Sequence, residues 1–134
     1  MNTNQIKKDT NCKIMQGTNN AVKCSKSPGE SERHRQFKFY LACFCWDNGL
    51  DFATEVTFPG GQRGDFVVKD WGICLELLGS EKYTDFQKKT YPLPTIPINT
   101  KLYWEDVEKM MKDLQSCNGT NYEYYQKHYK EEQQ

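Results

Sequence analysis

The sequence predicts an α/β domain in which a mixed central sheet is flanked by helices. Two observations lead to this prediction. Three strand-like runs follow a first helix, separated by turns short enough for a meander, and a helix, a strand and a last helix come after them. A meander followed by a helical crossover gives a mixed sheet covered by helices. With 134 residues, the chain has the length of one domain with its own core.

The first 29 residues are rich in Asn, Lys, Thr and Ser and show little periodicity. We therefore expect residues 1–29 to form an irregular, flexible arm that ends at Ser27-Pro28-Gly29. Ser31 has the position of an N-cap, which predicts a helix to about Asp47, and Asn48-Gly49 is a typical helix end. Apolar residues occur on more than one face of this helix, so we expect it to be well buried.

Three strands are predicted next. Residues 51–58 alternate in polarity and end in the turn Pro59-Gly60-Gly61, and residues 64–69 alternate again. Residues 73–78 are apolar almost throughout, which is typical of a central strand buried on both faces.

The second half of the predicted domain, residues 30–117, alternates helix and strand. We expect a helix over residues 80–90, a strand over 95–99 and a helix over 102–115. Pro97 places that strand at a sheet edge or marks its end. Residues 118–134 form a Tyr-rich tail, either a short amphipathic helix or a frayed end.

The charge of the chain is divided unevenly. Eighteen basic residues balance eighteen acidic ones, but up to Lys38 there are eight basic against three acidic residues, a charge of +5, which leaves −5 for the remainder. A basic arm often binds phosphate, although a solvated leader has the same composition. The chain has no apolar run long enough for a membrane span and no secretory signal at its start, so we expect an intracellular, cytoplasmic protein.

Acidic residues within the predicted strands need an explanation. Glu55, Asp65 and Glu76 lie on three successive strands among apolar neighbours, and burying a carboxylate is costly without a compensating partner. Asp65 and Glu76 belong to neighbouring strands and are expected side by side. Two such carboxylates repel each other unless a cation bridges them, and oxygen ligands suit Mg²⁺ or Mn²⁺. Such a metal can activate water for attack on a phosphodiester. Alternatively, these acids mark strand ends or pair with basic residues, for which the candidates are Arg63, Lys69 and Lys82.

The segments around these acids resemble the PD-(D/E)XK nuclease superfamily, which has the restriction-endonuclease-like fold. The resemblance rests on Glu55, on Gly64-Asp65-Phe-Val-Val and on Leu75-Glu76-Leu-Leu-Gly-Ser80-Glu81, and it extends from Glu30 to about Leu114. The segment from Glu30 to Lys38 is similar to the first helix of resolvase-like and competence-type members. The resemblance implies a helix, a three-stranded meander, a helix, a strand and a helix, which is the order predicted above.

The resemblance also implies roles for individual residues. Asp65 and Glu76 hold the metal together with the Leu77 carbonyl, and Glu55 or Glu32 (Glu30 as the alternative) supplies a further carboxylate. The Lys of the motif falls at Leu78, so either this Lys has moved or catalysis has been lost. Lys88 and Lys89 are favoured replacements over Lys82, and Gln87 is another candidate. Ser80 matches a position near the phosphate, and it is also a candidate N-cap.

Basic residues on the first helix and in the first hairpin complete the expected DNA contacts. His34 and Lys38 are four residues apart and share a helix face. These two residues and Arg35 are candidates for contact with the DNA strand or with the metal site, and Arg63 is a further candidate for the DNA strand. A solvated helix face would contain the same residues.

The six cysteines lack the paired spacing of a zinc site, and Cys74 resembles a core residue. If any local disulfide forms, Cys12 and Cys24 are the candidates; a zinc site formed by these two with a helix cysteine and His34 is the less favoured alternative.

The sequence therefore predicts a Mg²⁺- or Mn²⁺-dependent deoxyribonuclease that acts on duplex or branched DNA, with a homodimer as a candidate assembly. Two alternatives stay open. One is a catalytically inactive DNA- or protein-binding module on the same fold, which the Leu at position 78 favours. The other is an interaction protein that uses the basic arm and the Tyr-rich tail as contact surfaces.

Overall fold

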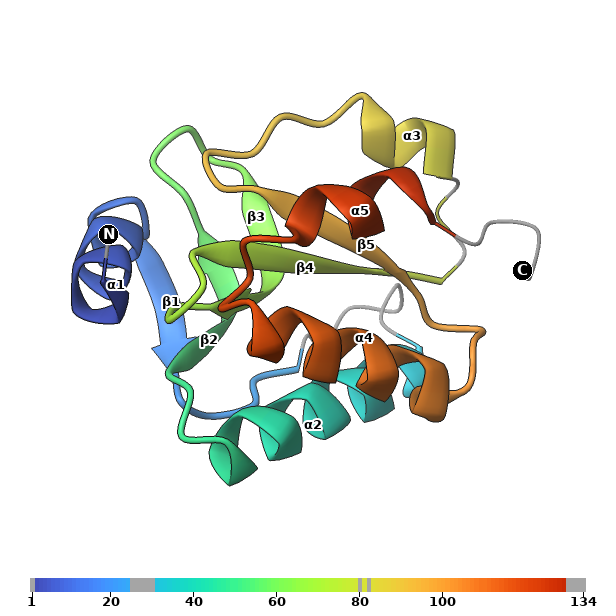
Figure 1. Ribbon diagram of the computed structural model, residues 1–134. Coiled ribbons are helices and arrows are strands. Elements are labelled where there is room, and N and C mark those ends of the chain that lie inside the picture. The colour runs from blue at the N-terminus through green and yellow to red at the C-terminus, as the bar shows by residue number, and fades with distance from the viewer. Residues whose placement is uncertain (1, 25–30, 80, 82, 130–134) are drawn as a thin grey trace.

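The chain forms an α/β fold built on a five-stranded mixed sheet (Figure 1). The structure is a computed structural model that describes residues 2–24, 31–79, 81 and 83–129. The strand order is β1-β2-β3-β4-β5; the first four strands pair antiparallel, and β5 runs parallel to β4. The strands are β1 (Gln16–Asn19), β2 (Phe52–Thr57), β3 (Arg63–Val68), β4 (Ile73–Leu78) and β5 (Thr95–Asn99). The helices are α1 (Thr3–Cys12), α2 (Glu32–Asp47), α3 (Tyr83–Gln87), α4 (Trp104–Ser116) and α5 (Tyr122–Lys127).

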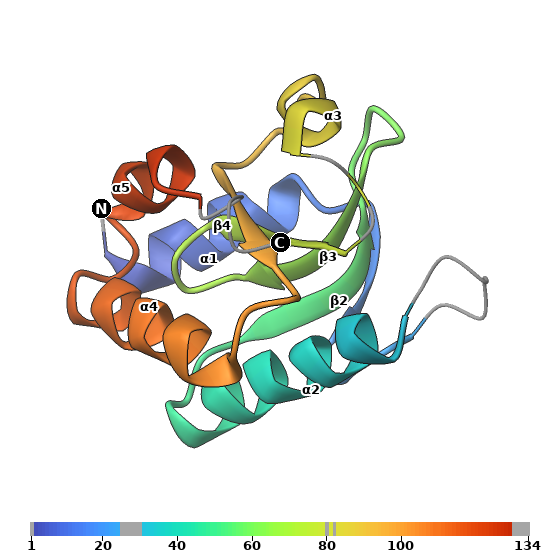
Figure 2. The same ribbon diagram turned by 90° about the vertical axis from the view of Figure 1, so that its right-hand side faces the viewer.

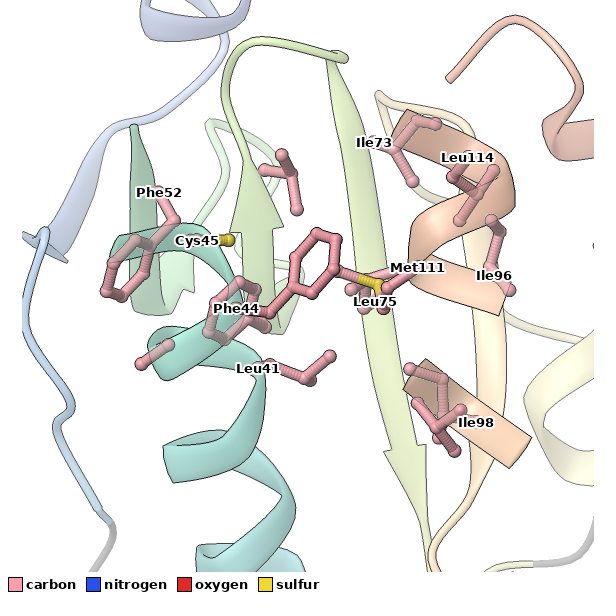
Figure 3. Close-up of a cluster of buried hydrophobic side chains, with 14 of the residues drawn as sticks. Leu41, Phe44, Cys45, Phe52, Ile73, Leu75, Ile96, Ile98, Met111 and Leu114 are labelled. Atoms are coloured by element: carbon pink, nitrogen blue, oxygen red, sulfur yellow. The ribbon is translucent and has the colours of Figure 1, made fainter. Parts of the chain in front are cut away.

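The main core lies between the sheet and the helix pair α2 and α4, which run along the same side of it (Figures 1 and 2). Period-two alternation sends every second residue of the strands into this core, including Phe66 of β3 and Leu75 of β4. Figure 3 shows Leu75 and Met111 meeting at the centre of the cluster. The other face of the sheet carries a smaller cluster that includes Val67, Cys74 and Leu93. The predicted mixed sheet flanked by helices is thus confirmed.

Helix α2 begins and ends where the sequence predicts. The Ser31 side chain accepts a hydrogen bond from the His34 backbone N–H at 3.1 Å, which satisfies one of the free donors of the first turn. At its other end, Gly49 has φ +65°, a conformation that glycine adopts without a steric cost. Arg33 ties the start of the helix to the segment before α4, because it donates to the carbonyls of Thr100 (2.7 Å) and Leu102 (2.6 Å). The expectation of thorough burial holds for only one face, since the opposite face exposes large aromatic rings.

The prediction that residues 1–29 are irregular is wrong for α1 and β1. Asn2 caps α1 by accepting from the Gln5 N–H at 2.8 Å, and Lys7 of that helix pairs with Asp51 at 3.0 Å. The edge strand β1 pairs antiparallel with β2. Its sequence, Gln-Gly-Thr-Asn, has no strand pattern, because an edge strand is held through backbone groups that every residue supplies.

The crossover helix and the tail also differ in extent from the prediction. Over residues 80–90, the described helix comprises only the five residues of α3, and Ser80 and Lys82 lie outside the described residues. Of the two alternatives for the tail, the structure has the short helix: α5 lies along β5, where the Gln126 side-chain amide donates to the Thr95 carbonyl at 3.0 Å. β5 is an edge strand of the sheet, as Pro97 predicted. Within the described residues, no helix is both long and apolar enough to cross a bilayer.

The turn between α4 and α5 requires glycine at one position, which yields a stability prediction. Gly119 has φ +79°, and a Cβ there would lie 2.7 Å from the Trp71 Cβ and 2.8 Å from the Ile73 Cδ1. We expect Gly119→Ala to lower the free energy of unfolding by about 2–4 kcal/mol, because backbone strain and overpacking add. Denaturant unfolding measures this loss.

Gly49→Ala is the matched control. Gly49 also has a positive φ, but nothing lies within 4 Å of the position of its Cβ. This substitution should cost only the backbone strain, about 1–2 kcal/mol. Equal losses in the two variants would show that the contact with Trp71 and Ile73 carries no cost.

Candidate active site

Two carboxylates join β3 to β4 at the point where the regular pairing of these strands ends. The last backbone pair is Phe66 opposite Leu75. Beyond it, the Asp65 N–H donates to Glu76 Oε1 at 2.7 Å, and the Leu77 N–H donates to Asp65 Oδ2 at 2.8 Å. Each carboxylate therefore accepts a hydrogen bond from the backbone of the other strand. Asp65 and Glu76 therefore occupy adjacent positions on the neighbouring strands β3 and β4.

The second oxygen of each carboxylate faces a side chain from outside the β3–β4 pair. Glu76 Oε2 accepts a hydrogen bond from the Tyr91 hydroxyl at 3.2 Å. Asp65 Oδ1 lies 3.4 Å from His34 Nε2, an ion-pair contact when the ring is protonated. Cys74 is buried beside the pair, with its Sγ 3.9 Å from Glu76 Oε1. Each carboxylate is thus contacted at both of its oxygens.

Of the two carboxyl groups, that of Glu76 is the one whose ionisation is made unfavourable by its surroundings. Its side chain lies on a central strand and is only 6% exposed. Burial, followed by the negative charge of Asp65, raises the pKa of Glu76 to about 8, against an ordinary value of 4.5. The hydrogen bonds from the Asp65 N–H and from Tyr91 act in the opposite direction but do not cancel the effect. The site therefore does not hold two ionised carboxylates at neutral pH unless a further positive charge compensates them.

Helix α2 directs two basic side chains at two acids of the sheet. His34 and Lys38 are one helical turn apart, and their partners, Asp65 and Glu55, belong to the neighbouring strands β3 and β2. Glu55 lies opposite Asp65, because its neighbours Thr54 and Val56 pair with the residues on either side of Asp65. The three acids predicted from the sequence therefore form a row across β2, β3 and β4.

Lys38 is the most deeply buried cation of this row. Its side chain has no exposure, and its Nζ lies 3.5 Å from Glu55 Oε2 and donates to the Lys23 carbonyl at 3.1 Å. Its amine therefore faces an acid within the protein rather than the solvent side of α2, where a DNA contact was expected. Glu55 has φ +49°, an uncommon conformation for a residue with a side chain. Such strain persists only where surrounding contacts enforce it.

A basic cavity adjoins the acid pair. This surface cavity, of about 380 Å³, is lined by Tyr91, which binds Glu76, and by Arg63 and Lys89. The hydrogen bond with Glu81 is the main cause that raises the pKa of Lys89, and the charges of Glu76 and Asp65 add to it. Of the two lysines favoured from the sequence, Lys89 thus lies in the field of the acid pair. Arg63 lines this cavity and also a neighbouring one that contains Glu55 and Lys23.

Other residues predicted for the site lie elsewhere or have other partners. Glu32 is exposed in the first turn of α2, where it accepts a hydrogen bond from Gln36, and Arg35 is exposed on the outer side of that helix. Leu78, in the position of the motif lysine, is fully buried. Leu77 contributes its N–H to Asp65, as described. Lys88 and Gln87 lie at the end of α3, and Ser80 and Glu30 fall outside the described residues.

Tyr91 was missed by sequence reasoning. It stands between Thr90 and Pro92 in a connection without periodicity, so no local signal distinguishes it from a loop aromatic. The structure has no disulfide among the described residues, so the predicted candidate pair of Cys12 and Cys24 is not bridged. Burial raises the pKa of the Cys74 thiol, which favours the uncharged form of that core residue.

The acid pair offers oxygen atoms, which are the ligands that a hard cation prefers, but it offers only a few of them. Among the described residues, no group of three or more His, Cys, Asp or Glu side chains is arranged to hold a metal ion. Mg²⁺, however, is commonly bound through one or two carboxylates, with water and substrate phosphates completing its shell. The oxygen donors of Asp65 and Glu76 fit this mode, in which the bound cation would supply the positive charge that keeps both groups ionised. They do not fit a cage made of protein ligands alone.

Comparisons with protein-family models, with curated protein sequences and with solved structures find no match for this chain.

The raised pKa of Glu76 predicts how stability depends on pH. Below about pH 4.5 the carboxyl is protonated in both the folded and the unfolded chain, so its contribution to stability is fully present. As the pH rises towards 8, Glu76 ionises in the unfolded chain before it ionises in the folded protein. The free energy of unfolding therefore falls over this interval. We expect Glu76→Gln to gain stability relative to the wild type over this interval, as measured by denaturant unfolding at several pH values without divalent cations. Glu123→Gln, at an exposed acid of α5, is the control; a stability difference between the Glu76→Gln variant and the wild type that stays constant with pH would contradict the prediction.

The buried pair of Lys38 and Glu55 makes a separate prediction. Removing one member of a buried ion pair leaves a charge without compensation, so Lys38→Met and Glu55→Gln should each lower the free energy of unfolding by about 3 kcal/mol. The double variant should lose clearly less than the sum of the two, because neither charge is then left alone. A double-mutant cycle in denaturant measures this coupling. Additive losses would show that the two side chains act independently.

Proposed function

We propose that the protein is a metal-dependent deoxyribonuclease of the PD-(D/E)XK type, which hydrolyses DNA phosphodiesters at the pair formed by Asp65 and Glu76. The observation that carries this proposal is the adjacency of these two carboxylates on β3 and β4, whose own donors do not compensate two negative charges, so that the pKa of Glu76 is raised. The order of helix, meander, helix and parallel strand supports it, because the restriction-endonuclease-like fold uses the same order.

Asp65 and Glu76 would hold Mg²⁺ or Mn²⁺ through their carboxylate oxygens. The ion, when bound, supplies Lewis-acid stabilisation of the charge on a phosphodiester and lowers the pKa of water. The chain itself contributes positioning: the backbone N–H groups of Asp65 and Leu77 fix one oxygen of each carboxylate, and Tyr91 orients Glu76. A cation bound here would also lower the pKa of Glu76 and keep it ionised.

Lys89 and Arg63 are the residues that we assign to the DNA phosphate. Both line the cavity beside Tyr91, and Lys89 lies in the field of the acid pair. In this role Lys89 replaces the motif lysine, whose position is occupied by the buried Leu78. His34, beside Asp65, is a positioning residue that directs the carboxylate from the side of α2.

A catalytically inactive binding module on the same fold is the second candidate. Two observations favour it: Leu78 is buried in the place of the motif lysine, and both carboxylates already accept hydrogen bonds from the backbone. The basic cavity would then bind nucleic acid without cleaving it.

Cleavage of labelled single-stranded, duplex and branched DNA distinguishes the two candidates. With Mg²⁺ or Mn²⁺ we expect cleavage that a chelator abolishes and that Asp65→Asn and Glu76→Gln each reduce by at least about 100-fold, because each removes a charged ligand. Lys89→Met should reduce the rate by a similar factor. Lys112→Met, at an exposed lysine of α4, is the matched control and should leave the rate unchanged. Retardation of DNA without cleavage in either metal would overturn the nuclease and support the binding module.

A further inference from the structure

A cavity of about 370 Å³ lies between β5, α4 and α5, and we call it the β5 cavity. Figure 1 shows the arrangement that encloses it, with α5 lying along β5 and α4 beside them. Its volume is within the range of small-molecule sites. Apolar side chains of β5 and α4 line one part of it, among them Ile98, Leu102 and Met110. None of the described residues that we assign to the metal or to DNA lines this cavity.

Aromatic rings from the C-terminal segment line the other part of the β5 cavity. They belong to Tyr124, Tyr125, His128 and Tyr129. The rings of Tyr124 and His128 stack on each other, with centroids 4.1 Å apart and planes inclined by 14°. Tyr124 is nevertheless 58% exposed. Stacked, accessible rings of this kind offer a flat face to a planar ligand, and any nucleobase can stack on such a face.

These rings are positioned by contacts within the protein. Tyr129 stacks on Tyr83 at a centroid distance of 4.5 Å, and the Tyr83 hydroxyl donates to the Gln126 carbonyl at 3.2 Å. The Tyr125 hydroxyl donates to a carboxylate oxygen of Asp113. Rings that are already fixed lose little conformational entropy when a ligand binds. The aromatic part of the cavity is thus organised before binding.

The outer edge of β5 adds a backbone acceptor to the cavity. The Cys74 N–H donates to the Pro94 carbonyl, and the Thr100 N–H donates to the Leu78 carbonyl. The even-numbered residues of this segment therefore direct their backbone groups at β4. Pro97, which lines the cavity, directs its carbonyl at the opposite edge, where α5 lies. A ligand with apolar surface alone would bury this carbonyl without a donor, which is unfavourable.

Two charged residues of α4 also line the β5 cavity. Asp106 and Lys109 are exposed and lie one helical turn apart on the same face. Among the described residues, no carboxylate forms an ion pair with Lys109, whereas Lys112 of the same helix pairs with Glu108. Lys109 can therefore bind an anionic group of a ligand without giving up a partner.

We propose that the β5 cavity binds a nucleotide whose base carries an exocyclic amine, such as adenosine monophosphate. This inference is independent of the nuclease proposal. The base stacks on Tyr124, and its amine donates to the Pro97 carbonyl. The phosphate lies at Lys109, and Asp106 accepts a hydrogen bond from the sugar. The same base chemistry occurs in a free nucleotide and in single-stranded nucleic acid, and two probes distinguish these sources.

Isothermal titration calorimetry of the full chain, with EDTA present, tests the proposal. We expect adenosine monophosphate to bind with a dissociation constant on the order of 10 µM to 1 mM. Tyr124→Ala should weaken binding at least about 10-fold, because the stacking face is lost. Tyr103→Ala is the matched control, since Tyr103 is a 78% exposed ring beside α4 that does not line the cavity. Lys109→Met should weaken binding of the monophosphate more than that of adenosine, with Lys112→Met as its control.

A change in the ligand tests the Pro97 contact without altering the protein. Inosine monophosphate has the same ring system, sugar and phosphate, but a carbonyl oxygen replaces the exocyclic amine. It should bind at least about 5-fold more weakly than adenosine monophosphate, because two acceptors would then face each other. Equal affinities for the two nucleotides would overturn the assigned orientation of the base and with it the proposal.

A single-stranded oligodeoxyadenylate is the second probe. Tighter binding of this strand than of the free nucleotide, with the same dependence on Tyr124, would assign the site to a base of single-stranded nucleic acid; the reverse order would assign it to a free nucleotide. In NMR titrations of the wild type, either probe should shift resonances of α5, β5 and the first half of α4, and not those of α1. Failure of both probes to bind would overturn the proposal. Binding that Tyr124→Ala leaves unchanged, or shifts that map away from α5, would overturn it as well.

Discussion

The reciprocal hydrogen bonds between two carboxylates and two backbone N–H groups hold the candidate site together. Where the β3–β4 ladder stops, the carboxylates of Asp65 and Glu76 accept the hydrogen bonds that backbone carbonyls would otherwise accept, so each side chain is bound to the backbone of the opposite strand. The cost of this arrangement is a carboxylate on a central strand with a pKa of about 8. Three other segments of the chain bring side chains to this pair: Tyr91 binds Glu76, His34 contacts Asp65, and Lys89 lies in the field of both acids.

Each face of helix α2 has a different environment in the fold. One face fills the core with Phe37 and Leu41, and a flank of the same helix delivers His34 and Lys38 to the acid row. The remaining face exposes the rings of Phe39 and Trp46 to solvent. A helix with a single apolar side would show an amphipathic pattern in its sequence. Helix α2 does not, because its apolar residues are distributed around the whole circumference. The same property led the sequence to suggest a fully buried helix.

Much of the fold could be predicted because its signals are local. The Ser31 cap, the alternation of β3 and the apolar run of β4 each depend on neighbouring residues, and each was placed to within a few residues. The adjacency of Asp65 and Glu76 followed from strand order alone. Edge strand β1 could not be predicted, because backbone pairing leaves no side-chain pattern. Tyr91 and the burial of Lys38 depend on contacts 15 or more residues apart, which no local pattern encodes.

The charge at Asp65 and Glu76 is not required by the hydrogen bonds that these residues make. An amide oxygen would accept the same backbone N–H bonds without the cost of burying an anion, so Asn and Gln would serve a purely structural connection at a lower free energy. A carboxyl group at both positions therefore lowers the free energy of unfolding relative to an amide, which indicates that the acidic groups have a role beyond joining the strands. The nearby lysines compensate this charge only in part, because Lys38 pairs with Glu55 and Lys89 pairs with Glu81. A divalent cation would allow both carboxyl groups to be ionised at neutral pH, and the proposed hydrolytic role depends on this property of the pair.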